Sequence, residues 1–279
     1  MSNSSTGITA NLPFAEYLAI DAMNTSTLKK VGQSPQHAQH ALLTPSEPSA
    51  AFVIGDAFHG LVLEPDRFAE EYAEAPDRPK RTKADKEAWE DWTEAHPNTT
   101  ALKPADWDAI HKMQISVLFH ETAAEILAGE GSNELTMVWE DAETGALCKG
   151  RADRFTTFDG VSVIADLKST IDASPDGWAR SSARFGYHQQ AAWYLDGANA
   201  LAPMDRRFLF ICCEKTAPYG VTVQELDADA IAAGEKLNRI YLRRWLRCVE
   251  KQIFNGYPDG VLKFGLPGWT RNEIDKLEE

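Results

Sequence analysis

The chain has 279 residues, with 28 Lys and Arg against 42 Asp and Glu, so its formal net charge at neutral pH is −14. This charge excludes a protein that coats DNA over its whole surface, because such binding relies on abundant basic residues that displace counterions from phosphates. Any contact with nucleic acid must therefore be local. The length fits one catalytic domain with a helical N-terminal part and a substantial core.

Cysteine spacing and hydropathy narrow the class of protein further. The four cysteines show no C-x₂-C or C-x₄-C spacing, so neither a zinc site nor an iron–sulfur cluster is indicated, and we expect reduced, mostly buried thiols. The N-terminus lacks the charged and apolar regions of a signal peptide, and no apolar run approaches the roughly 18–20 residues that cross a bilayer. We therefore expect a soluble, cytoplasmic protein with no membrane partner.

The first half of the chain is predicted to be mainly helical after a loosely ordered, Ser- and Thr-rich stretch over residues 1–12. Asn24 predicts the cap of a short helix, and Ser34 followed by Pro35 predicts the start of another. Residues 44–49 predict a loop. Helical spacing of apolar residues, ended by Pro or Gly, predicts further helices over residues 50–63, 84–95 and 104–128.

The second half combines strands with two helices. Its first three β-runs are joined by hairpin-like sequences, such as the turn at Asp159 and Gly160, and predict an antiparallel meander. The predicted fold class is therefore α/β (mixed α+β), a central mixed sheet flanked by helices on both faces. The predicted strands cover residues 134–139, 147–155, 161–169, 206–215 and 219–226, and the predicted helices cover 178–198 and 227–254.

The candidate catalytic residues lie on two neighbouring predicted strands. Asp166 and Lys168 stand two apart and project from the same face, and the hairpin turn brings Asp153 back beside them. Two carboxylates and an ammonium would then share one site, which suits Mg²⁺ or Mn²⁺ and phosphodiester chemistry. Asp-x-Lys also occurs by chance on surface strands, but here the strand is aliphatic, where unpaired charges are costly to bury.

Several longer segments resemble the phage-type RecE (exonuclease VIII) family of PD-(D/E)xK nucleases over nearly the whole chain. One departure is that Ala152 stands where the family pattern has proline, which is not a metal ligand. The resemblance implies a restriction-endonuclease-like core in one domain over residues 13–279, with a helical part at about 13–130 and the catalytic sheet at about 131–279. The segments are NTSTLKK, SPQHA, GDAFHGLVLEPDRF, RPKRTKADKE, VWEDAETGALCKGRADRF, IADLKST, YHQQAAWYLDG and LPGW.

The same resemblance adds residues to the expected site. A lone histidine such as His59 is more often packed or capping, but the match to GDAFHGLVLEP implies a metal ligand in the neutral form. Gln190 and Tyr194 stand four residues apart on one helical face. They match the Gln-xxx-Tyr motif of the RecB-like branch, although a helical face with Tyr and Trp more often simply packs in the core. Glu134 has two open interpretations, an extra acidic neighbour of the metal or a solvated strand end.

Candidate DNA contacts come from basic residues. The segment with Arg78, Lys80, Arg81 and Lys83 is either a phosphate-binding element or a solvated loop. The helix start that carries Ser26 and Lys29, together with Thr27 and Lys30, could hold a terminal phosphate through backbone N–H groups and nearby charge.

The resemblance implies a Mg²⁺-dependent DNA exonuclease, in which Mn²⁺ can substitute for Mg²⁺. It would act 5′ to 3′ on linear duplex ends and leave 3′ single-stranded tails for recombination. It also implies a ring-like homo-oligomer and cooperation with a single-strand annealing protein. Two alternatives stay open: a structure-specific or single-strand endonuclease of repair or defence, and a non-catalytic DNA-end or protein-binding module on a nuclease fold.

Overall fold

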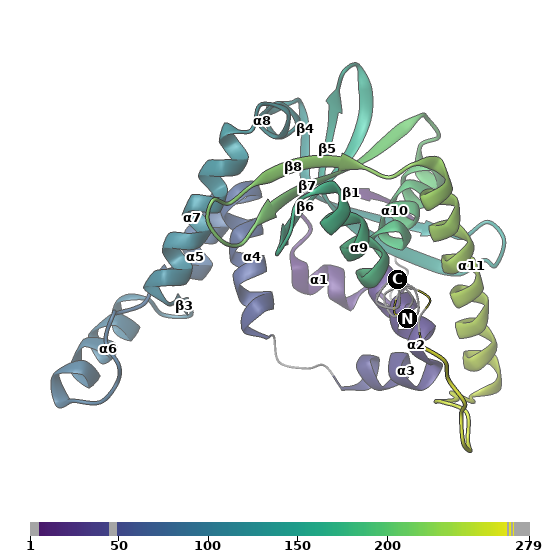
Figure 1. Cartoon of the computed structure of the whole chain (residues 1–279), viewed down its shortest axis with the longest axis horizontal. Coiled ribbons are helices and arrows are strands. Elements are labelled where there is room, and N and C mark those ends of the chain that lie inside the picture. Colours follow the sequence, from purple (N-terminus) through teal and green to yellow (C-terminus); the bar gives the residue numbers. More distant parts are fainter. Residues whose placement is uncertain (1–5, 45–48, 267, 269, 271–279) are drawn as a thin grey trace, which may run out of the picture.

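A six-stranded mixed sheet lies at the centre of the protein, in a computed structural model that describes residues 6–44, 49–266, 268 and 270 (Figure 1). The strand order is β1-β4-β5-β6-β7-β8, and all neighbours are antiparallel except β6 and β7. A separate parallel pair is formed by β2 (Tyr72–Glu74) and β3 (Thr100–Leu102). The strands of the main sheet are β1 (Gly7–Thr9), β4 (Gly131–Glu140), β5 (Leu147–Phe158), β6 (Val161–Thr170), β7 (Arg206–Glu214) and β8 (Val221–Glu225).

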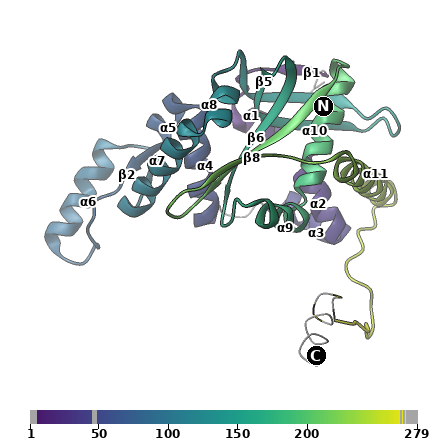
Figure 2. The ribbon, with the colours of Figure 1, turned by 45° about the horizontal axis from the view of Figure 1, so that its top comes forward.

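Helices cover both faces of this sheet, as the two ribbon views show (Figures 1 and 2). One layer contains α4 (Ala50–Leu63), α5 (Pro65–Glu71), α7 (Pro104–Phe119) and α8 (Glu121–Ala128). The other contains α2 (Thr25–Gln33), α9 (Pro175–Phe185), α10 (Tyr187–Leu201) and α11 (Ala228–Lys251). The remaining helices are α1 (Phe14–Ala19), α3 (Pro35–Leu43) and α6 (Lys83–Ala95).

Alternation along β6 divides the hydrophobic core into two clusters. Val163, Ala165 and Leu167 are buried against the α4 and α7 layer, whereas Ile164 is buried against the α10 layer. Successive strand residues point to opposite faces, so Asp166 follows Ile164 toward α10. The predicted catalytic residue Asp166 thus lies on the face of β6 that packs against the apolar α10 layer.

The predicted antiparallel meander is confirmed for β4, β5 and β6. Asp159 and Gly160 both have positive φ, 52° and 75°, as a tight hairpin turn requires. The predicted mixed sheet with helices on both faces is also confirmed. All four cysteines are free, and three are buried. In the part of the chain described, every helix is too short or too polar to span a bilayer.

Two predicted helices are each broken into two. The helix predicted over residues 104–128 stops at Phe119, and His120 caps the next helix by accepting the Ala123 N–H on Nδ1 at 3.3 Å. The helix predicted over 178–198 starts earlier and breaks at Gly186, whose φ of 66° is left-handed. Apolar periodicity continues across both breaks, so it could not reveal them.

The ends of the chain differ from the prediction in two places. Within the stretch expected to be loosely ordered, Gly7–Thr9 forms the edge strand β1, paired to β4. The final helix ends at Lys251 rather than near residue 254, because Gln252 adopts a left-handed conformation with φ of 53°. Residues 1–5, residues 45–48 of the predicted loop, and Pro267 and Trp269 of the LPGW segment lie outside the described residues.

The segment after β1 is fastened to the sheet by a buried lysine. Lys149 on β5 is 3% exposed, and its ammonium donates to the carbonyls of Tyr17, Leu18 and Ile20 at 2.9, 3.2 and 2.7 Å. These carbonyls lie at the C-terminal end of α1 and just after it, where intrahelical donors run out. The contact holds α1 against the sheet.

Close packing of α10 on α11 gives the first prediction. A Cβ at Gly234 would lie 2.2 Å from the His188 carbonyl oxygen, so Gly234→Ala should force the helices apart and cost about 2–3 kcal/mol of unfolding free energy. Gly55→Ala in α4 is the matched control, because its Cβ would meet Ser169 Oγ only at 3.9 Å. In urea unfolding, Gly55→Ala should leave the free energy of unfolding unchanged or raise it. Equal midpoints for both variants would contradict the packing argument.

Candidate active site

Asp153 lies where the sheet separates. The β5–β6 ladder ends at the pair Arg154–Ala165, so Asp153 is the next residue after the last pair. The β4–β5 ladder also omits the pair of Asp153 with Glu134, although the register on either side is unchanged. In the gap, the Asp153 carboxylate accepts the Leu167 backbone N–H at 2.8 Å. This carboxylate therefore replaces a ladder carbonyl at the fork between the strands.

Asp166 and Lys168 form a buried ion pair beside this fork. Asp166 is 1% exposed, Lys168 Nζ contacts its Oδ2, and Gln190 Nε2 on α10 donates to its Oδ1 at 2.7 Å. The three predicted catalytic residues are thus close enough to affect one another electrostatically. The structure also brings Gln190 to the predicted carboxylate.

His59 on α4 reaches the same site from the opposite layer. Its Nδ1 lies 3.4 Å from Asp153 Oδ2. Burial and the nearby Lys168 ammonium lower the pKa of His59, in spite of the surrounding carboxylates, so the imidazole is neutral near pH 7. A neutral ring is the form that can coordinate a metal.

The two charged neighbours have opposite protonation preferences. Burial and the Asp166 carboxylate raise the pKa of Asp153 to about 8. Burial alone would lower the pKa of Lys168, but the Asp166 and Asp153 carboxylates outweigh it and raise that pKa above its ordinary value. Lys168 therefore stays an ammonium, while Asp153 gains a proton unless another positive charge reaches it.

The donor set fits a hard divalent cation. Asp166 Oδ2 is buried, and Lys168 is the one ion-pair partner that contacts it within the described residues. No three His, Cys, Asp or Glu side chains converge into a closed cage in that part of the chain. Mg²⁺ does not need one, because it binds through one or two carboxylates, waters and substrate phosphates. Asp153 and Asp166 would hold the ion, with His59 adjoining them.

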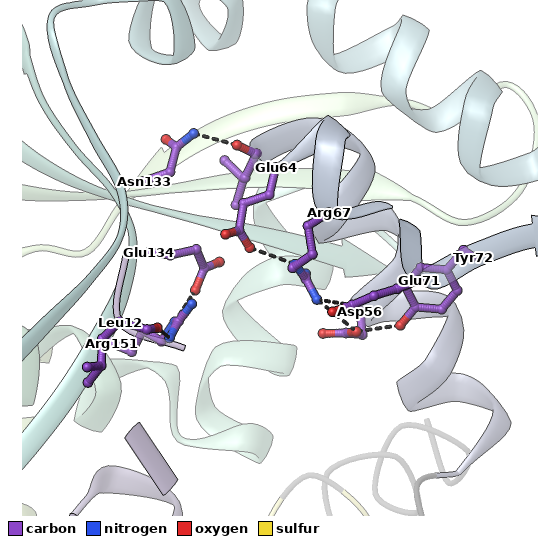
Figure 3. A network of polar contacts seen from close by, with 10 residues as sticks. Leu12, Asp56, Glu64, Arg67, Glu71, Tyr72, Asn133, Glu134 and Arg151 are labelled. Atoms are coloured by element: carbon purple, nitrogen blue, oxygen red, sulfur yellow. Dashed lines mark hydrogen bonds and ion pairs between the residues drawn. The ribbon is translucent and has the colours of Figure 1, made fainter. Parts of the chain in front are cut away.

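Glu134 is already engaged by an arginine. Its Oε2 accepts from Arg151 Nε at 2.5 Å, and Arg151 Nη1 donates to the Leu12 carbonyl at 2.6 Å (Figure 3). Burial and Asp153 raise the pKa of Glu134 to about 7, although Arg151 opposes the shift. Glu134 thus adjoins Asp153 electrostatically, but its carboxylate is held by a cation rather than left solvated.

A second charged network fixes α4 and α5 beside the site. Arg67 donates to Glu64 and Glu71 at 2.8 and 2.7 Å, and it lies 3.7 Å from Asp56, which also accepts from the Tyr72 hydroxyl (Figure 3). One guanidinium thus pairs with three carboxylates. It holds the α4–α5 corner that places His59.

Tyr194 packs against the sheet at a glycine. A Cβ at Gly150 would lie 3.0 Å from the Tyr194 ring, so the absence of a side chain on β5 admits the ring. Burial raises the pKa of Tyr194 well above its usual value, so its hydroxyl stays protonated. Tyr194 is 7% exposed and lines the cleft described below.

Lys29 on α2 lies near the Asp166–Lys168 ion pair. Its Nζ is 5.5 Å from the centroid of the Tyr187 ring, which also lies 5.2 Å from Lys168 Nζ. Burial and the Lys168 charge lower the pKa of Lys29 to about 8, although Asp166 opposes the shift. Its sequence neighbour Ser26 lines the cleft instead.

The basic segment with Arg78, Lys80, Arg81 and Lys83 lies elsewhere. It precedes α6, which both ribbon views place at the far end of an arm (Figures 1 and 2). Lys80 Nζ lies 4.1 Å from the Trp89 ring centroid, and Lys83 pairs with Glu87. The segment does not line the cleft.

A cleft of about 760 Å³ opens onto Asp153, His59 and Tyr194. One wall is the N-terminal segment with Phe14 and Tyr17, which Lys149 and Arg151 hold in place. Sequence reasoning missed this wall and both basic residues. The only available signal was their spacing, at two and four positions before Asp153 on one strand.

Comparison with solved structures supports the fold. A crystal structure from Eubacterium rectale of a protein named “Putative exonuclease” has a TM-score of 0.64 at 15% identity, covering 94% of this chain and 97% of that one. The structure of SSO0001 is 15% identical and covers 84% of this chain and 87% of its own. The structure of VC1899 from Vibrio cholerae is 12% identical and covers 87% of this chain and 62% of its own. Their TM-scores of 0.28 and 0.24 are too low to establish a shared fold. No curated protein matches the chain.

A family model matches residues 24–258, which include every residue of the site from Ser26 to Tyr194. That range covers most of the chain and every strand of the main sheet except β1. The chain therefore belongs to the family described as PDDEXK-like domain of unknown function (DUF3799).

Proposed function

We propose that the protein is a metal-dependent DNA exonuclease that resembles RecE and degrades linear duplex DNA from 5′ to 3′. The observation that carries the proposal is the convergence of Asp153, Asp166 and Lys168 at the strand fork, beside His59 and Gln190. The PDDEXK-like family and the fold shared with a protein named as an exonuclease support a nuclease. Polarity and the 3′ single-stranded product rest on the sequence resemblance.

Each residue has a role that follows from its surroundings. Asp153 and Asp166 would hold Mg²⁺ or Mn²⁺, which when bound would polarise the phosphate and lower the pKa of a water ligand. Lys168 stays protonated and stabilises the negative charge that develops on the phosphate oxygens. Gln190 fixes the Asp166 carboxylate, and His59 adjoins the cation in neutral form.

Binding of the DNA end is assigned to the start of α2 and to the arm. Ser26 lines the cleft and Lys29 lies beside Lys168, which supports contacts to a terminal phosphate. The basic segment before α6 would grip duplex phosphates further from the site. A ring of subunits with cations facing its channel would reconcile DNA binding with a net charge of −14. A single-strand annealing protein is the proposed partner for the product.

Substitution of the catalytic pair tests the chemistry. Asp166→Asn and Lys168→Gln should each lower Mg²⁺-dependent release of nucleotides from linear duplex by at least about 100-fold, because each removes charge that acts on the reacting phosphate. Asp159→Asn in the exposed hairpin turn is the control and should cleave at the rate of the unmodified protein. Unchanged digestion by both site variants, with intact folding by circular dichroism, would refute the assignment.

Substrate topology tests the mode of cleavage. Linear duplex should be digested in the presence of Mg²⁺, a 5′-end label should be released before a 3′-end label, and a chelator should stop both. Closed circular duplex should survive under the same conditions, because it presents no end. Nicking or linearisation of the circle would instead establish an endonuclease.

The raised pKa of Asp153 predicts how stability depends on pH. Between its ordinary value of 3.8 and about 8, the folded protein keeps a proton that the unfolded chain has lost, so metal-free stability falls as pH rises through this range. Asp153→Asn removes that contribution. With chelator present, thermal unfolding should show the unmodified protein losing stability relative to Asp153→Asn between about pH 5.5 and about pH 8. Parallel curves for the two proteins would contradict the raised pKa.

A further inference from the structure

A second groove, of about 420 Å³, lies between the end of β6 and the exposed face of α9. Arg180 and Arg184 line it from α9, four residues apart and therefore on one helical face, and Lys215 lines it from the residue after β7. This groove is separate from the cleft that opens onto Asp153, and the site described above uses none of these three cations.

The charge of the groove is opposite to that of the whole protein. The carboxylate that lines it belongs to Asp172, whose Oδ2 lies 3.7 Å from Arg180 Nη2. Arg184 and Lys215 have no carboxylate within ion-pairing distance in the described part of the chain, and Arg184 is exposed. In a protein of net charge −14, this pocket of three cations and one acid is an anion-binding surface.

Aromatic and aliphatic surface adjoins these cations. Phe185 lines the groove with 50% of its surface exposed, and the Arg184 guanidinium lies 5.3 Å from its ring centroid. Ile171 lines the groove with 88% exposed. A row of cations beside an exposed ring is the arrangement that binds single-stranded nucleic acid, through phosphates and base stacking respectively.

The groove adjoins the proposed catalytic pair, although neither Asp166 nor Lys168 lines it. Ser169 and Thr170 directly follow Lys168 on β6 and line the groove. Tyr187 also lines it, and the Tyr187 ring centroid lies 5.2 Å from Lys168 Nζ. A strand whose phosphate is held at Asp166 and Lys168 can therefore extend into the groove without crossing the body of the protein.

We infer that this groove binds the single strand that bears the scissile phosphate, with its phosphates on Arg180, Arg184 and Lys215 and a base stacked on Phe185. The inference rests on the proposed nuclease function for the identity of the strand. The groove explains how a strongly acidic protein holds a polyanion next to a site with two carboxylates. It also favours substrates whose end is frayed or unpaired, because a paired strand cannot place its base on Phe185.

Charge removal in the groove tests this inference. Fluorescence anisotropy with a labelled single-stranded oligonucleotide, in the presence of chelator, measures binding without cleavage. The double variant Arg180→Ala/Arg184→Ala should bind the oligonucleotide at least about tenfold more weakly. The slope of log affinity against log salt concentration should become shallower by about 1.4, as expected for the loss of two single-strand phosphate contacts. Arg239→Ala/Arg247→Ala removes the same charge from exposed positions on α11 and should bind as the unmodified protein does.

Stacking is tested separately. Phe185→Ala should weaken binding by about tenfold with an unchanged salt slope, because a base contact is lost and no phosphate contact is. Unchanged affinity in both the arginine and the phenylalanine variants, or equal weakening by the α11 control, would overturn the inference.

Cleavage assays distinguish failure of the groove from failure of the proposed function. On linear DNA with Mg²⁺, Arg180→Ala/Arg184→Ala should raise KM while kcat changes less than about twofold, since the groove does not touch the reacting atoms. If the unmodified protein cleaves no DNA, the proposed nuclease function is refuted. The anisotropy measurement would still test whether the groove binds single-stranded DNA. Normal cleavage with normal KM in the variant would refute the groove alone.

Discussion

The buried ion pair between Asp166 and Lys168 is the interaction on which the rest of the structure depends. Removing two charges from water costs several kcal/mol per ion, and the pair recovers this cost only with good geometry and further hydrogen bonds. Gln190 supplies one of those bonds, and the nearby Asp153 makes the site short of positive charge. The arrangement is therefore incomplete as a purely structural feature, and a divalent cation is the group that would complete it.

The fold supports this pair by bringing residues from both helical layers to one fork in the sheet. His59 comes from the layer with α4, whereas Gln190 and Tyr194 come from α10 on the other face. Near the point where β5 and β6 separate, His59 from one layer contacts Asp153, and Gln190 from the other layer contacts Asp166. The fork itself is stabilised by the Asp153 carboxylate, which accepts the Leu167 N–H that would otherwise lack a partner.

The distribution of charge separates the parts of the molecule that meet DNA in our proposals. The cleft side is crowded with carboxylates, most of which form ion pairs with Arg67 or Arg151. The groove with Arg180, Arg184 and Lys215 shares no lining residue with the cleft and adjoins Lys168 through Tyr187. In our proposal, a DNA strand that leaves the metal site moves toward these cations. The net charge of the whole protein could not reveal this direction.

The sequence by itself determined the meander, the mixed sheet and the meeting of Asp153, Asp166 and Lys168, the three residues of our catalytic proposal. Strand alternation and turn chemistry are local, so Asp166, Lys168 and the Asp159–Gly160 turn could be recognised from their neighbours. The helix breaks at His120 and Gly186 escaped prediction, because apolar periodicity continues through them. Tertiary structure alone decided that Lys29 reaches the catalytic pair and the basic segment before α6 does not, and that Lys149 and Arg151 hold the N-terminal wall. These are contacts between segments far apart in the chain, and no local pattern specifies which distant groups a buried charge will meet.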